Sequence, residues 1–342
     1  MEERYFLGAN SRAGFASLYG HFCTAPGDTL HVIKGGPGTG KSGFMRRIAQ
    51  AAQARGLDVE TVLCSGDPDS LDGVYIPALR QGWADGTAPH TLDPAHFGAD
   101  GDYVDLGRFC RPLREADRAR VLALNEAYKD RYAAAYRWLA AAGALHSAAP
   151  GTALAGEAER KLRRRLRGVL QREAPRGSGG EKLRFLSAIS CRGLMSLPLP
   201  AGCRRVYRLD EERGFAAHAL RLAAEEAAAR GLERIVCPSP LDPGEPEALL
   251  LPGAGIAFLS GKRAGERERG VHPGRLLPPP EREEKLERRR VRHMEREALE
   301  AAVAQLRRAK ALHDELEAVY RPYMDFGALT SFTEETIEDV FR

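Results

Sequence analysis

The chain has 342 residues, of which 43% are hydrophobic and 29% are charged. This composition is typical of a folded globular protein and excludes a collagen-like or wholly disordered chain. The 51 lysines and arginines exceed the 47 acidic residues by a formal charge of only +4, which is too small to indicate a nucleic-acid-binding protein by itself. Because the chain is about twice the usual length of one domain, a second or a duplicated domain is expected.

The cysteines and the N-terminal residues indicate the compartment. The six cysteines contain no C-x-x-C pair, so a zinc motif is not indicated and a reducing compartment fits best. Residues 1–5 read Met-Glu-Glu-Arg-Tyr, which is acidic where a secretory signal is basic, and no apolar run approaches the roughly 20 residues that span a bilayer. We therefore expect a cytoplasmic protein with no membrane partner.

The most informative segment is a glycine-rich loop, Gly35–Ser42, which reads Gly-Gly-Pro-Gly-Thr-Gly-Lys-Ser between a short apolar run and a helical pattern. It fits G-x-x-x-x-G-K-[ST] in the strand-to-helix context that this pattern requires. Glycines allow the backbone to wrap a phosphate with inward-pointing amides, and the helix N-terminus adds the positive end of its dipole. Lys41 is expected to contact the β and γ phosphates, and the Ser42 hydroxyl to ligate Mg²⁺.

The segment Gly35–Ser42 resembles the Walker A motif of P-loop NTPases. The resemblance implies a parallel α/β sheet flanked by helices, ATP or GTP as the ligand, and Mg²⁺ as the cofactor. The chain has no convincing N-K-x-D guanine signature, which favours ATP. The nucleotide-binding residues implied by the resemblance are Gly35, Gly36, Pro37, Gly38, Thr39, Gly40, Lys41, Ser42 and Gly43.

A second acid is needed to hold the magnesium, ordinarily at the end of a neighbouring apolar strand. Asp85 is the favoured candidate, although the run before it is short and weakly apolar. Asp67 is its rival because it follows the stronger strand signal of residues 59–63, but its Asp-Pro-Asp context is also ordinary turn chemistry. If Asp85 holds the metal, Asp67 is expected to face the γ phosphate or the attacking group. His90 either senses that phosphate or is an ordinary loop residue.

An internal repeat runs through the chain in three ordered blocks. Residues 6–18 match 185–197, residues 54–57 match 229–232, and residues 136–145 match 320–329. Blocks that recur in the same order with modest gaps indicate a duplication. The sequence therefore predicts two tandem P-loop NTPase-like domains, each a three-layer α/β unit with a parallel sheet, and each ending in a long helix, Glu115 to Ala142 and about Pro280 to Tyr320.

The second copy of the phosphate loop is predicted to be inactive. In the alignment the loop falls on Asp210–Ala217, which starts with three acidic residues that would repel a triphosphate. The arrangement is similar to a little-characterised group of bacterial ATPases with two tandem P-loop domains, and it departs from that group because the second loop is lost. The aligned pairs that remove the chemistry are Lys41/Ala216, Ser42/Ala217 and Asp85/Ser260.

The predicted organisation has three parts: a nucleotide-binding domain over 1–146, a basic helical linker over 147–180, and a degenerate copy over 181–342. Arginines cover one side of the linker from Arg160 to Arg172, where they either form a solvated face, bind a nucleic-acid or protein partner, or reach the nucleotide. The expected function is Mg²⁺-dependent ATP binding with ATPase activity, the second copy being structural or regulatory. The alternatives are a small-molecule kinase that acts on an acceptor and a nucleotide-switched interaction module.

Overall fold

The computed structural model describes residues 2–342 except 89–91, 150–153, 212, 263–264 and 266–267, so His90 lies outside the described residues. It is an α/β protein that divides into two compact units. Each unit is made of segments that are separated in the sequence, whereas the predicted ranges 1–146, 147–180 and 181–342 follow chain order. Unit 1 comprises Met1–Leu139, Ala188–Met195 and Glu300–Arg342, and unit 2 comprises Ala140–Ser187 and Ser196–Leu299.

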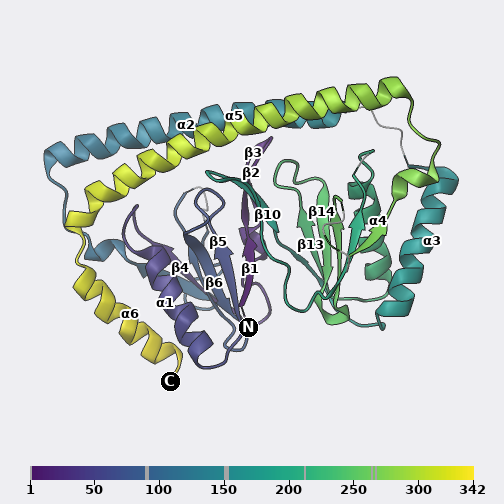
Figure 1. Ribbon diagram of the computed structural model, residues 1–342. Helices are drawn as coiled ribbons and strands as arrows, with labels where there is room; N and C mark the ends of the chain where they lie inside the picture. The colour runs from purple at the N-terminus through teal and green to yellow at the C-terminus, as the bar shows by residue number, and fades with distance from the viewer. Residues whose placement is uncertain (1, 89–91, 150–153, 212, 263–264, 266–267) are drawn as a thin grey trace. The chain divides into compact units, whose positions relative to one another are not determined.

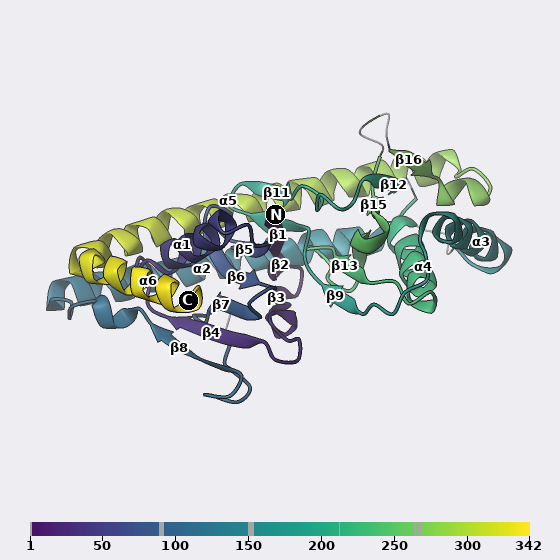
Figure 2. The same ribbon diagram turned by 90° about the horizontal axis from the view of Figure 1, so that it is seen from below.

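Unit 1 contains a six-stranded sheet in the order β1-β5-β6-β7-β4-β8 (Figures 1 and 2). β1 is parallel to β5, and β4 is parallel to β7 and β8, whereas β6 is antiparallel to both of its neighbours. The prediction of a parallel sheet is therefore wrong at β6. The strands are β1 (Glu2–Phe6), β4 (Thr29–Lys34), β5 (Val59–Leu63), β6 (Leu71–Ile76), β7 (Gln81–Asp85) and β8 (Gly101–Asp105).

The antiparallel direction of β6 follows from its connections. Residues 64–70 join β5 to β6, and residues 77–80 join β6 to β7. Parallel neighbours need a crossover of a dozen residues or more, usually with a helix. Connections this short can only reverse the chain, so the sheet is mixed.

Helices α1 (Lys41–Ala54) and α6 (Phe326–Val340) pack together in unit 1 (Figure 2). Apolar side chains of α1 recur at helical spacing and are buried against the sheet. The shared core includes Phe44 and Ile48 from α1, Val74 and Trp83 from the sheet, and Leu329 from α6. A hairpin of β2 (Gly8–Ser11) and β3 (Gly14–Ser17) and the single turns η1 (Tyr19–His21) and η2 (Gly107–Phe109) complete the N-terminal part.

Unit 2 repeats the strand order of unit 1. Its sheet runs β9-β13-β14-β15-β12-β16, and β14 is antiparallel to both neighbours, as β6 is in unit 1. The other neighbours in this sheet are parallel. The strands are β9 (Glu181–Leu183), β12 (Arg205–Leu209), β13 (Arg234–Pro238), β14 (Pro246–Leu251), β15 (Ile256–Ser260) and β16 (Arg269–Val271).

Two long helices contribute residues to both units, α2 (Glu115–Ala148) and α5 (Arg282–Tyr320). Their positions agree with the long helices expected from sequence. Among the described residues, no helix combines the length and the apolar character needed to cross a bilayer. The remaining elements are the hairpin strands β10 (Ser187–Ser190) and β11 (Gly193–Ser196), and the turns η3 (Pro252–Ala254), η4 (Pro273–Leu276) and η5 (Arg321–Tyr323).

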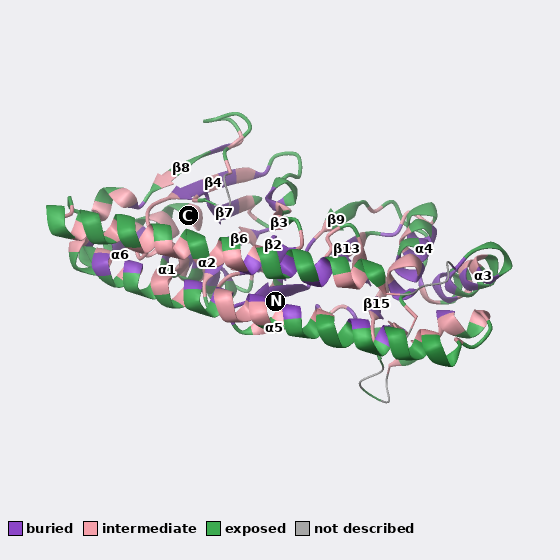
Figure 3. Cartoon of the chain, turned by 90° about the horizontal axis from the view of Figure 1, so that it is seen from above, coloured by how far each residue is buried: buried purple, intermediate pink, exposed green. Residues whose placement is uncertain are grey.

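The basic segment predicted as a linker forms α3 (Gly156–Glu173), which packs against α4 (Ala216–Ala229) in unit 2. Leu162 and Leu166 on α3 are buried in the core of this unit. The Arg167 guanidinium donates to the Glu226 carboxylate at 2.7 Å. Arg160, Arg164 and Arg165 of α3 are exposed, and Figure 3 shows both exposed and buried stretches along this helix. The segment is thus part of the unit 2 core with a basic outer face.

Candidate functional site

The glycine-rich loop of unit 1 connects β4 directly to α1. Gly38 and Gly40 have positive φ angles of 70° and 85°, a left-handed conformation that a Cβ disfavours. Gly40 is the residue before the first turn of α1, where amide groups have no partner within the helix. The strand, loop and helix therefore follow one another as the sequence predicts, and the loop ends at the positive end of the helix dipole.

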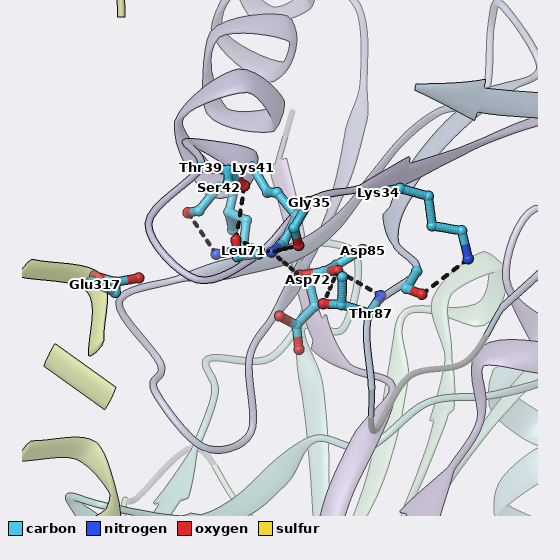
Figure 4. A network of polar contacts seen from close by, with 12 residues as sticks. Lys34, Gly35, Thr39, Lys41, Ser42, Leu71, Asp72, Asp85, Thr87 and Glu317 are labelled. Atoms are coloured by element: carbon cyan, nitrogen blue, oxygen red, sulfur yellow. Dashed lines mark hydrogen bonds and ion pairs between the residues drawn. The ribbon is translucent and has the colours of Figure 1, made fainter. Parts of the chain in front are cut away.

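The Lys41 ammonium lies at the mouth of this loop. Its Nζ donates to the carbonyl oxygens of Gly35 at 2.8 Å and Gly36 at 2.9 Å, and it lies 3.6 Å from Oδ2 of Asp85 (Figure 4). The two side chains are only 13% and 12% exposed, which strengthens their attraction relative to bulk water. The loop therefore holds one positive charge beside one fixed carboxylate.

Asp85 is the last residue of β7, and it is paired in register with Ile33 of the parallel strand β4. Its Oδ1 accepts hydrogen bonds from the backbone N–H of Thr87 at 2.9 Å and from the Thr87 hydroxyl at 2.6 Å. The second predicted acid, Asp67, lies in the loop after β5, with its Oδ2 3.4 Å from Nζ of Lys310. Of the two rivals, Asp85 is the one that lies beside Lys41.

Ser42 and Thr39 fix the start of α1. The Ser42 Oγ accepts a hydrogen bond from the backbone N–H of Leu71 at 2.9 Å. The Thr39 hydroxyl donates to the carbonyl oxygen of Gly36 at 2.8 Å, which closes the loop on itself. These bonds place the Ser42 oxygen next to the start of β6.

Asp72 is a site residue that sequence reasoning missed. It is only 4% exposed, and the β6–β7 register that pairs Gly73 with Ala84 places it opposite Asp85. Residues opposite one another in an antiparallel pair have Cβ atoms about 4.5–5.5 Å apart. The Tyr19 hydroxyl donates to Oδ2 of Asp72 at 3.1 Å. The sequence offered one signal for this residue, because Asp72 is the one acid in the mostly apolar strand β6.

The surroundings of Asp72 change the acidity of its neighbours. Burial, and then the negative charge of Asp72, raise the pKa of the Tyr19 hydroxyl above its usual value. The same two causes raise the pKa of the Cys64 thiol. Both groups therefore remain protonated at neutral pH and lie against the carboxylate as neutral donors.

The donor atoms around Lys41 fit the predicted magnesium. Mg²⁺ prefers hard oxygen ligands and usually takes one or two carboxylates together with water and phosphate. Ser42, Asp72 and Asp85 supply such oxygens at one end of the sheet. Two carboxylates that face one another are stabilised by a nearby cation, and Lys41 places one beside Asp85. A different group on α5, His313, Asp314 and Glu317, brings its ligand atoms within 4.8 Å of one another.

A cavity of about 1640 Å³ in unit 1 opens beside the phosphate loop. It extends from Gly35–Gly43 past Asp67 and Asp72 to residues of α2 and α5. Pockets for one small ligand usually measure about 300–1000 Å³, so this cavity has room for more than one. α5 lies close to the loop, since a Cβ added at Gly38 would be 3.2 Å from the carbonyl oxygen of Glu317.

The counterpart loop in unit 2 lacks this chemistry. α4 begins at Ala216 as α1 begins at Lys41, and β15 ends at Ser260 as β7 ends at Asp85. The helix is preceded by Phe215, whose φ of −96° differs from the left-handed Gly40. The structure therefore places alanine and serine where unit 1 has its ammonium and its carboxylate.

Residues of the counterpart loop form hydrogen bonds and an ion pair with other residues of unit 2. The Arg213 side chain is 9% exposed and donates to the carbonyl oxygens of Gly274 at 3.3 Å and Pro278 at 2.8 Å. Asp210 lies 3.2 Å from Nδ1 of His272, and burial raises the pKa of Glu211 to about 7. The third acid of this loop, at position 212, lies outside the described residues.

No protein-family model matches the chain, no curated protein matches it, and no solved structure matches it. The likeness to P-loop NTPases is therefore carried by the residues Gly35–Ser42 and by the contacts of Lys41, Ser42 and Asp85.

Proposed function

We propose that unit 1 binds ATP together with Mg²⁺ and hydrolyses it. The observation that carries the proposal is the Lys41 ammonium at the mouth of a left-handed glycine loop, 3.6 Å from the Asp85 carboxylate. A strand, a glycine-rich loop and a helix N-terminus make an anion-binding turn. The lysine and the neighbouring acid add the charges that a magnesium-bound triphosphate requires.

Each residue of the site has a role in this proposal. The loop amides cradle phosphate oxygens, and Lys41 neutralises charge on the β and γ phosphates. Ser42 and Asp85 hold the metal, and Thr87 keeps the Asp85 carboxylate in position. A bound Mg²⁺, held by these residues, would supply positive charge that offsets the charge of the triphosphate. Unit 2 then serves a structural or regulatory purpose, without a nucleotide of its own.

The test is a calorimetric titration of ATP with Mg²⁺ into the wild-type protein and a Lys41→Ala variant. We expect the variant to bind at least about 100-fold more weakly, because a charge-assisted contact to phosphate is lost from a mostly buried site. Lys182→Ala is the matched control, since Lys182 is an exposed lysine of unit 2, and it should leave the affinity within about twofold. Equal affinity in the wild type and the Lys41 variant would exclude the proposal.

A small-molecule kinase is the second candidate function, and the size of the cavity favours it. The phosphate loop occupies one end of the cavity, whereas Asp67 and residues of α2 line the rest. A kinase releases little ADP until its acceptor is present. Measuring ADP release with and without candidate acceptors therefore separates the kinase from an ATPase.

A further inference from the structure

A second cavity of unit 1 lies between the start of α2 and the turn η5 that follows α5. It measures about 570 Å³, which is within the range usual for one small ligand. Among the described residues that line it, three are arginines, Arg111, Arg114 and Arg120, and one is an acid, Asp117. We call this cavity the arginine cleft.

The arginine cleft is distinct from the cavity beside the glycine-rich loop. Of its described lining residues, Ala318 and Pro322 also line the larger cavity, whereas no residue of Gly35–Gly43 lines the cleft. A ligand in the cleft therefore does not contact the loop, and its binding can be measured separately from that of ATP.

The acid of the cleft is already paired. Oδ2 of Asp117 accepts a hydrogen bond from Nε of Arg114 at 3.0 Å and another from the Tyr323 hydroxyl. The bond from Tyr323, and then the bond from Arg114, lower the pKa of the Asp117 carboxyl, and the charge of Arg120 acts in the same direction. Asp117 is therefore ionised at neutral pH and holds its two partners in one arrangement.

Arg111 and Arg114 are also held by the chain that follows α5. The Arg111 guanidinium donates to the carbonyl oxygen of Pro322 at 3.0 Å, and its backbone N–H donates to that of Tyr323 at 2.9 Å. Nε of Arg114 lies 3.0 Å from the Tyr323 hydroxyl oxygen. Side chains that are fixed before a ligand arrives lose little freedom when it binds, which favours affinity.

Arg120 supplies a charge that has no partner in the described part of the chain. It is exposed, and its guanidinium forms no ion pair or hydrogen bond with a described residue. Arg114, Asp117 and Arg120 recur every three residues, so each lies beside the next on the surface of the helix. Three guanidinium groups and one carboxylate leave the cleft with two uncompensated positive charges.

We propose that the arginine cleft binds a small organic dianion, whose carboxylate or phosphate oxygens contact the guanidinium groups and whose carbon skeleton contacts the apolar wall. Guanidinium presents paired N–H groups that match the oxygens of carboxylate and phosphate. Two negative charges balance the two uncompensated positive ones. Pro112 and Val319 supply apolar surface, which an inorganic ion would not use. The inference does not rest on ATP binding, because the cleft and the loop are separate.

The experiment measures the binding of matched probes by ligand-observed NMR at constant ionic strength. At pH 8 glycerol 3-phosphate carries two charges on one group, whereas succinate carries one at each end. Glycerol and succinamide are their uncharged counterparts, and acetate carries a single charge. We expect the dianion whose charge spacing fits the cleft to bind with a Kd of about 1 mM or lower, at least about tenfold more tightly than acetate or the uncharged compounds.

Three variants then locate the binding. Arg120→Glu should weaken binding of that dianion at least about tenfold, because it removes both uncompensated charges of the cleft. Arg137→Glu is the matched control, since Arg137 is an exposed arginine of the same helix, about 25 Å further along its axis, and it should leave the affinity within about twofold. Lys41→Ala should also leave it within about twofold, whereas Arg120→Glu should leave ATP affinity within about threefold.

Three results would overturn the inference while the proposed function stands: neither dianion binds more tightly than its uncharged counterpart, acetate binds equally well, or Lys41→Ala rather than Arg120→Glu removes the binding. Failure to bind ATP would instead overturn the proposed function and leave the cleft. Thermal unfolding checks that each variant is folded. If Arg120→Glu does not fold, Arg120→Ala, which suits an exposed helix position, decides: we expect a loss of about threefold or more, and an unchanged affinity counts against the site.

Discussion

The loop before α1 and the loop before α4 occupy the same place in two sheets with the same strand order, yet only one has the residues for a phosphate. In unit 1 the loop ends in Gly40 and Lys41, and in unit 2 it ends in Phe215 and Ala216. The strands and the helix on either side are retained in both. The difference teaches that this fold forms without the glycine, lysine and serine that end the unit 1 loop.

The two loops also differ in what surrounds them. In unit 1, Lys41 donates to carbonyl oxygens of its own loop and lies beside Asp85. In unit 2, the Arg213 side chain donates to carbonyl oxygens near η4. Both positive charges therefore hold backbone carbonyl oxygens, but only Lys41 also lies beside a carboxylate at the edge of a cavity. Four variants, taken in order of decreasing expected effect, test the differences between the two units.

Gly40→Ala should have the largest effect, with Gly214→Ala as its control in unit 2. Both glycines have positive φ, 85° and 74°, so each substitution should cost about 1 kcal/mol of stability. Only the first should weaken ATP binding, by about 100-fold or more, because it also distorts the glycine-rich loop. A Cβ at Gly40 would lie 2.6 Å from a Leu329 methyl group, whereas the space around Gly214 is open. Calorimetry with ATP and Mg²⁺ checks the difference, and equal losses would contradict it.

Asp85→Asn should weaken ATP binding by about 10- to 100-fold when Mg²⁺ is present, the range typical of a lost metal-site group. The loss should be much smaller in EDTA, because the carboxylate acts on the metal. Ser260→Ala, at the equivalent end of β15, should change neither affinity. A titration series over Mg²⁺ concentration measures this, and an Asp85 effect that is independent of Mg²⁺ would speak for Asp67 as the metal-holding acid.

Glu247→Gln should alter how the stability of unit 2 depends on pH. Burial raises the pKa of Glu247 to about 7 from an ordinary 4.5, so the unfolded chain loses this proton first as the pH rises. The free energy of unfolding of the wild type should therefore fall between pH 4.5 and 7. Glutamine does not ionise, so the variant avoids the free-energy cost of a buried carboxylate. The difference in melting temperature, variant minus wild type, should therefore be larger at pH 8 than at pH 5. Calorimetric scans at both values provide the test, and a difference independent of pH would refute it.

Changing Arg160, Arg164 and Arg165 to glutamate should have the smallest effect on the nucleotide, with ATP affinity within about twofold. These residues are on the exposed side of α3, whereas Arg163 and Arg167 pair with Glu226. Retention on a heparin column should fall, because basic surface charge is lost. A large loss of ATP affinity would instead support an arginine that reaches the nucleotide.

The glycine-rich strand–loop–helix segment of unit 1, and the helix start that aligns with it in unit 2, were predictable from sequence because both depend on local pattern. The glycines, Lys41 and Ser42 lie within one short run, and the aligned pair Lys41/Ala216 proves to mark the first residue of α1 and of α4. Both candidate acids were predictable from the strand signals before them, whereas only the structure shows that Asp85 lies beside Lys41 and Asp67 beside Lys310.

The parts that were missed depend on chain direction or on distant contacts. Alternation of apolar residues gives no direction for β6, and only the short connection 77–80 could have excluded a parallel pair with β7. Asp72 became a candidate through its position opposite Asp85. The charged residues at the start of α2 fit any exposed helix face, and their relation to the arginine cleft depends on Tyr323, far along the chain.

The assembly of unit 1 from separated segments has a consequence for synthesis of the protein. Unit 2 uses residues no later than Leu299, whereas unit 1 needs Glu300–Arg342, which contribute Met324 and Leu329 to its core. A ribosome makes the chain from its N-terminus, so all residues of unit 2 are made before the last residues of unit 1. The glycine-rich loop, although it is made early, receives these packing partners only after residues 300–342 have been made.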